Sequence, residues 1–178
     1  MNATCCHSFL HSHLSSRGLH RQRGVMAIEF ALVFLFGVLP LLLLTMSGVL
    51  LYAAQESLTL AAAEGARAAL HYGTTAQRVT SACQAAEESM TWLLTFSGET
   101  PNCAAPTAPG SGTYSPVAVS APITCPDTPS VQCITVQASY DYNNHPFFPG
   151  TATVYGWVLG KNVTINSSAT VQLNIAGS

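Results

Sequence analysis

An uncharged and strongly apolar run of 25 residues, Phe30 to Ala54, constrains this chain more than any other feature. About 20 such residues in a helix cross the hydrocarbon core of a bilayer. The apolar region of a cleaved secretory signal is shorter, about 7–15 residues, although LTLAAAEGA downstream imitates its cleavage site. A buried helix of a soluble core is a third alternative. The length of the run favours a retained membrane helix over residues 25–54.

Charge is distributed unevenly about this run. Arg17, Arg21 and Arg23 precede it, and no acidic residue accompanies them. The positive-inside rule therefore predicts a cytoplasmic N-terminus and export of everything after about Tyr52. Beyond Gly24, three basic side chains stand against eight carboxylates, so the exported part lacks the basic patch that nucleic acid or anionic lipid requires. Nucleic acid is not an expected partner.

The six cysteines fall into two groups on the two sides of the apolar run. Cys5 and Cys6 lie in the basic leader, on the reducing side, and the other four lie in the exported part. Four thiols in an oxidising compartment predict two disulfides. Of the three possible pairings, we favour the one in which both disulfides close short local loops. A disulfide that closes a loop of around 20 residues contributes roughly 3 kcal/mol. The favoured pairs are Cys83 with Cys103 and Cys125 with Cys133. A zinc site made by the same four is the alternative, which no CxxC pair or well-spaced histidine supports.

The membrane helix is expected to continue past the bilayer surface. The sequence LYAAQESLTLAAAEGARAALHYG is rich in alanine and leucine and free of proline, and Gly73 is its first good stop. One helix from Val25 to Tyr72 is therefore predicted, with a kink at Pro40. Small residues recur four apart at Ala61, Gly65 and Ala69. They either allow another backbone to approach closely or serve only as helix formers.

A second helix and a loop-rich segment follow. Thr74 with Gln77 predicts a capping box, and an amphipathic stripe then runs to a stop before Gly98. The stripe predicts core packing and consists of Val79, Cys83, Ala86, Met90 and Leu93. From 99 to 130 proline, glycine, serine and threonine dominate, which predicts loop with one short strand at 116–120.

The C-terminal third changes to a period of two. Apolar and polar residues alternate in ITVQASYDY, 134–142, and in NVTINSSATVQLNI, 162–175, which predicts two strands of a small antiparallel sheet with one wet face. The connection 143–160 could be a loop, a short helix or a third strand. The predicted fold is α+β. It comprises a basic cytoplasmic leader (1–24), a transmembrane helix (25–54), a helical extension with a second helix (55–98) and a loop-rich β domain (99–178).

Signatures of catalysis are scarce. The motifs GxSxG, HExxH and GxGxxG and the phosphate-binding loop are absent, and no pair of carboxylates forms a recognisable catalytic arrangement. Asp141 and His145 are interpreted as turn or surface residues rather than catalytic groups. The stretch CCHSFLHSH is interpreted as part of an unstructured leader and not as a metal site. We expect no enzymatic activity, no cofactor and no metal.

Glu29 stands at the head of the apolar run. A lone carboxylate inside a membrane segment costs about 2.5–3.5 kcal/mol on insertion scales, which makes it a candidate functional residue. It could equally mark the cytoplasmic boundary of the membrane, where the cost is small. The residues alone leave both interpretations open.

Two motifs resemble those of a known family. The first is RQRGVMAIEFALVF, in which Gly24 is followed after four residues by Glu29-Phe30, and the second is AAAEGAR, from Ala61 to Arg67. Together with the closing strands, they resemble the TadE-like pseudopilins of the tight-adherence (Flp-type) pilus system, in the type IV pilin superfamily. Pro40 lies later in the apolar run than the family's usual proline. The related TadG and major Flp pilins share the N-terminal pattern, so the subfamily stays open, although the length fits TadE best.

The resemblance implies a mechanism and partners. A membrane prepilin peptidase would cut between Gly24 and Val25, which leaves Glu29 as the fifth residue, followed by Phe30. That glutamate would pair with the new N-terminal ammonium of a neighbouring subunit. The chain would be a minor pseudopilin in the bacterial inner membrane, surrounded by membrane lipid and acting structurally with other pilins and the assembly platform in pilus assembly and adhesion. The alternative is an uncleaved single-span protein whose exported domain binds a partner or envelope ligand.

Overall fold

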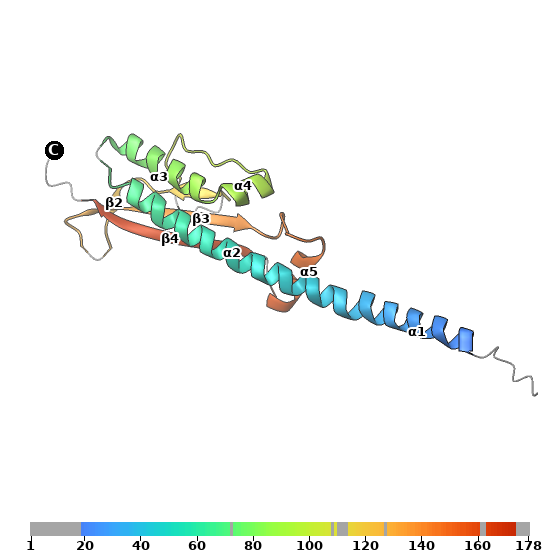
Figure 1. Ribbon diagram of the computed structural model, residues 1–178. Coiled ribbons are helices and arrows are strands. Elements are labelled where there is room, and N and C mark those ends of the chain that lie inside the picture. The colour runs from blue at the N-terminus through green and yellow to red at the C-terminus, as the bar shows by residue number, and fades with distance from the viewer. Residues whose placement is uncertain are drawn as a thin grey trace, which may run out of the picture. The chain divides into compact units, whose positions relative to one another are not determined.

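The fold is α+β, with a long apolar N-terminal helix, further helices and a small antiparallel sheet (Figure 1). The computed structural model describes residues 19–71, 73–107, 109, 114–126, 128–160 and 163–173. The chain divides into two compact units, Met1–Leu43 and Leu44–Ser178. The predicted fold class is confirmed at this level.

The long helix comprises α1 (Leu19–Val33), a π-helical turn η1 (Phe34–Val38) and α2 (Leu39–Ala68). Its segment Gly24–Ala68 is long and apolar enough to be a candidate membrane span. The prediction of an unstructured leader is wrong for its last six residues, which continue α1. They contain no proline, and extending an existing helix avoids the cost of nucleation. The first 18 residues lie outside the described part of the chain.

Pro40 is accommodated by η1, which ends two residues before it. A proline in a helix has no N–H to donate and its ring crowds the carbonyl four residues earlier. The wider π-helical turn, with hydrogen bonds five residues apart, relieves that conflict. A π-helical turn is therefore the local adjustment at the predicted kink.

The long helix ends at Ala68 and not at the predicted Tyr72. Tighter hydrogen bonds close its last turn, from the N–H of Leu70 to the carbonyl of Arg67 and from His71 to Ala68. The guanidinium of Arg78 then donates to the carbonyl oxygens of Ala69 and Gly73. The donor to Ala69 satisfies a carbonyl that the helix end leaves unpaired, so the helix can stop before a glycine is reached.

The predicted second helix is two helices, α3 (Thr75–Ser89) and α4 (Thr91–Ser97). The capping box is confirmed: the Thr74 hydroxyl accepts from the N–H of Gln77, whose side chain accepts from the N–H of Thr74. Met90 leaves the helical conformation between them, with φ −113° and ψ 19°. The predicted apolar stripe is buried along its whole length, and Gly98 ends α4 in the left-handed conformation.

β3 (Gln132–Asp141) is the centre of the four-stranded sheet. The short strands β1 (Val117–Val119) and β2 (Ile123–Thr124) pair with one edge of it, and β4 (Thr164–Leu173) pairs along the whole of the other, all antiparallel. The three predicted strands are confirmed. β2 was missed because its two residues, within the short segment from Pro122 to Pro126, are too few to show an alternation.

One face of the sheet carries the helices. Figure 1 shows α2 and α3 side by side over it, and the inward side chains of β3, from Ile134 to Tyr140, are buried there. The opposite face of β4 is exposed and polar, as the alternation predicted. A Cβ on Gly65 of α2 would lie 2.8 Å from the Ala82 carbonyl oxygen of α3 and 2.9 Å from Cγ1 of Val136. The small-residue face of the helix thus lets α3 and β3 approach within the same unit.

The ambiguous connection between β3 and β4 contains a helix, α5 (Thr151–Leu159). Gly150 and Gly160 bound it, with φ of 83° and 68°. These left-handed conformations are accessible to glycine without strain, so the two glycines define where the helix begins and ends. Thr151 and Ala152 are its buried residues.

Candidate functional site

The predicted processing and assembly residues lie together on α1, at the head of the candidate membrane span. Gly24, Val25, Glu29 and Phe30 are all exposed. Val25 and Glu29 are four positions apart, which places them one above the other on the same helix face. The ring of Phe30 stacks on that of Phe34, with 6.3 Å between their centroids.

Nothing in the described part of the chain explains why position 24 is a glycine or position 29 a glutamate. A Cβ on Gly24 would meet no described atom within 4 Å, so packing does not require a glycine there. Glycine within a helix costs up to about 1 kcal/mol relative to alanine. Within the described residues, Glu29 forms no hydrogen bond or ion pair. Among the described residues, nothing therefore gives either of them an intramolecular role that would account for its identity.

A buried chain of hydroxyl groups lies where α2, the end of β3 and the start of α5 meet. The Ser47 Oγ and Tyr142 Oη atoms are 2.6 Å apart, and Tyr142 Oη is 2.6 Å from Thr151 Oγ1. Thr151 donates in turn to the Phe148 carbonyl oxygen at 2.7 Å. Sequence reasoning missed this group. Its only local signal was Ser47, a hydroxyl in an apolar helix, which says nothing about a partner 95 residues away.

Beside this chain, Tyr155 of α5 donates to the Leu44 carbonyl oxygen of α2 at 3.1 Å. Gly48 lies close by, since a Cβ there would be 3.5 Å from the Tyr155 hydroxyl. The two tyrosines also meet edge to face, with ring centroids 6.0 Å apart.

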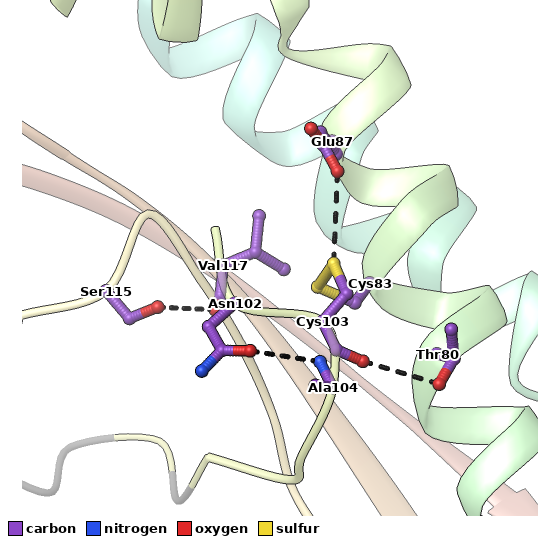
Figure 2. The surroundings of a disulfide bond; sticks show 8 residues. All are labelled: Thr80, Cys83, Glu87, Asn102, Cys103, Ala104, Ser115 and Val117. Carbon is purple, nitrogen blue, oxygen red and sulfur yellow. Dashed lines mark hydrogen bonds between the residues drawn. A yellow bond between two sulfur atoms is a disulfide. The ribbon is translucent and has the colours of Figure 1, made fainter. Parts of the chain in front are cut away.

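The two predicted disulfides are present, Cys83–Cys103 and Cys125–Cys133. They leave these four cysteines no thiolate for the zinc alternative. Figure 2 shows Cys103 joined to α3, where the Thr80 hydroxyl also donates to the Cys103 carbonyl oxygen at 3.3 Å. Glu87 Oε2 lies 3.9 Å from the Cys103 sulfur. A disulfide sulfur carries no proton to donate, so this approach is a contact in which the sulfur gives no hydrogen bond.

The side chain of Glu99, in the loop after α4, contacts Tyr114 and His145 beside the C-terminal end of β3. The Tyr114 hydroxyl donates to its carboxylate at 2.9 Å, and Nε2 of His145 lies 3.6 Å from the other oxygen. Burial, and then the hydrogen bond to Glu99, raises the pKa of Tyr114 well above its ordinary value. Burial likewise raises the pKa of Tyr140, whose hydroxyl donates to the His145 carbonyl oxygen.

Asp141 has the turn role predicted for it. One carboxylate oxygen accepts from the N–H groups of Asn143 and Asn144, and the other from the Asn144 side chain at 2.6 Å. These bonds hold the turn that leaves β3. Among the described residues, no three His, Cys, Asp or Glu side chains cluster as metal ligands would.

Comparisons with protein-family models, with curated proteins and with solved structures find no match to this chain. A function for this chain is therefore inferred from its own residues alone.

Proposed function

We propose that this chain is a minor pseudopilin of the tight-adherence pilus machinery, processed after Gly24 and acting structurally in pilus assembly and surface adhesion. It would be a single-pass protein of the bacterial inner membrane, with a cytoplasmic N-terminus and an exported C-terminal domain. One observation carries the proposal: Gly24 and Glu29-Phe30 stand exposed at the head of an apolar helix, where the described chain gives them no role of its own.

Cleavage would change the electrostatics of this segment. Removal of residues 1–24 takes away the three leader arginines and creates one ammonium group at Val25, one helical turn from Glu29. Each charge alone is costly in a membrane, whereas a pair between neighbouring subunits offsets part of that cost. An ion pair of this kind chiefly specifies the register of one subunit against the next. Gly24 would then be recognised by a peptidase, and Glu29 would contact a second subunit.

The remainder of the long helix supports a carrier role. From Ala54 to Ala66 one side of α2 is buried against the exported domain, whereas most of the apolar residues before it are exposed. A helix built in this way can hold a folded domain at one end and offer the other to lipid or to further helices. No catalytic group is needed for such a task.

The deciding experiment measures the mature N-terminus. The chain is expressed in cells with an active prepilin peptidase and in matched cells without it, and its intact mass and N-terminal sequence are determined. We expect loss of residues 1–24 and a start at Val25 only where the peptidase is present. Recovery of the intact leader in both strains would instead favour an uncleaved single-span protein whose exported domain binds a partner.

Three substitutions separate the proposed roles. Gly24→Ala should block processing, because the peptidase reads the residue before the cut. Glu29→Ala should be cleaved normally and yet impair assembly, and Glu29→Asp, which keeps the charge, should retain more assembly than Glu29→Ala. Equal pilus output from Glu29→Ala and the wild type would remove the role of Glu29 and leave the cleavage result standing.

A further inference from the structure

α5 leaves most of its apolar surface uncovered. Val154, Trp157 and Val158 follow the spacing of one helix face and are 41%, 85% and 65% exposed, and Leu159 at the end of the helix is 55% exposed. No residue of α5 carries a charge. A contiguous apolar surface of this kind on an exported domain usually marks a site of interaction.

The attachment of α5 to α2 indicates what covers this surface. Tyr155 is bonded to the Leu44 carbonyl oxygen and lies close to Gly48, so α5 lies against this stretch of α2. Counted from Phe30, the roughly 20 residues that cross a bilayer core end near Val49. Leu44 to Gly48 are then the last turns of the span, at the level where the hydrocarbon meets the headgroups.

Other residues of the same stretch of α2 are equally uncovered. Met46 and Val49 are 56% and 64% exposed and belong to the same unit as α5. In an aqueous setting, the apolar side chains of α5 and of this stretch of α2 would all be exposed to water. Tryptophan is enriched at membrane interfaces, where its apolar body and its N–H group are both accommodated.

We propose that α5 is a second membrane-contacting element, a short helix that lies in the outer boundary of the same bilayer that the long helix spans. Its occupant is lipid, and the Val154–Trp157–Val158 face is the surface that enters. The inference requires the long helix to span a membrane but does not require cleavage after Gly24. It therefore stands or fails separately from the pseudopilin assignment.

The test uses Trp157 as the reporter in the full chain. Trp92→Phe removes the other tryptophan, and phenylalanine can retain the stacking of that ring on Phe147. The variant is reconstituted into phosphatidylcholine vesicles with and without brominated acyl chains. We expect brominated lipid to remove most of the Trp157 emission and aqueous acrylamide to remove little.

Two substitutions in the same background give a matched comparison. Val158→Asp adds a charge to the proposed lipid face, and Ile123→Asp adds one to an exposed apolar position of β2, 53% exposed, which pairs with the opposite end of β3. We expect the first to reduce quenching by brominated lipid and the second to leave it unchanged.

Efficient quenching of Trp157 by acrylamide, with no effect of brominated lipid, would overturn the proposal. So would shielding from both quenchers that depends on the protein-to-lipid ratio, since a second copy of the chain would then cover α5. Neither result depends on whether Val158→Asp folds, because both are read from the variant with an unaltered α5.

Discussion

The Ser47 hydroxyl donates to the Tyr142 hydroxyl, 2.6 Å away and 95 residues later in the chain. The direction of this hydrogen bond follows from the other hydrogen bonds that the linked hydroxyl groups make. Thr151 gives its single hydroxyl proton to the Phe148 carbonyl oxygen, so it can only accept from Tyr142. Tyr142 has then used its own proton and must accept from Ser47. The protons run one way, from α2 through the end of β3 to the turn before α5.

Removing the central hydroxyl should destabilise the fold more than removing the first. We expect Tyr142→Phe to lower the free energy of unfolding by about 1–3 kcal/mol, since it leaves two buried hydroxyls without this partner. Ser47→Ala should cost less, about 1 kcal/mol, because Tyr142 still donates to Thr151. Thermal unfolding of the full chain in detergent micelles measures both. The double variant should lose less than the sum of the two, and strict additivity would show that the groups are independent.

Two glycines of α2 should respond oppositely to alanine. At Gly65 a Cβ would lie within 2.9 Å of both the Ala82 carbonyl oxygen and Val136 Cγ1, so α2 must move away from α3 and the sheet. We expect Gly65→Ala to destabilise the fold by about 1–3 kcal/mol. Gly48→Ala is the matched control, since its Cβ would make an ordinary contact at 3.5 Å and gain helix propensity. Equal unfolding temperatures for the two variants would contradict the packing of Gly65.

Counting free thiols should report processing. The four cysteines from Cys83 onward are paired in the two disulfides, and the remaining two, Cys5 and Cys6, precede the proposed cut. Alkylation in denaturant without reductant should therefore label no residue of the processed chain. The unprocessed chain should take up to two labels, both within residues 1–24. A labelled residue beyond Gly24 in protein from an oxidising compartment would contradict the disulfide pairing.

Stability should fall in alkaline solution. The pKa values of Tyr114 and Tyr140 are raised in the folded chain, so it keeps phenolic protons that the unfolded chain releases above about pH 10. The stabilisation is fully present below that pH and is lost as the pH rises through the folded-state pKa values. Unfolding temperatures measured across this range should decline more steeply for the wild type than for Tyr114→Phe. Superimposable profiles for the two proteins would contradict the assignment for Tyr114.

Features formed by residues that are close together in the sequence could be predicted from it. The capping box at Thr74, the buried stripe of α3 and α4 and the alternation along β3 each express one local period, and both disulfides close loops within their own neighbourhood. Features that depend on distant neighbours could not. The break at Met90 does not interrupt the apolar stripe, so periodicity gave no sign of it.

The candidate site divides in the same way. Gly24 and Glu29 were recognised because their pattern is local, whereas the link between Ser47 and Tyr142 exists only once β3 has folded against α2. Between β3 and β4, two glycines and an apolar segment suited a loop, a helix or a strand equally well. Folding resolved the choice in favour of α5, which is anchored through Tyr155 to a carbonyl that no sequence pattern identifies.

The two disulfides bear on how this protein would transmit mechanical tension. Cys83–Cys103 joins α3 to the loop after α4, and Cys125–Cys133 joins the residue after β2 to β3. The helix α2 contains no cysteine. Apart from the backbone connection that follows Ala68, a pull on the long helix would therefore reach the rest of the domain through non-covalent contacts, such as Ser47 with Tyr142 and Gly65 with Ala82. Under load the helix should slip from the domain before the loops closed by the disulfides open. Stretching single molecules would then release α2 first, under oxidising and reducing conditions alike.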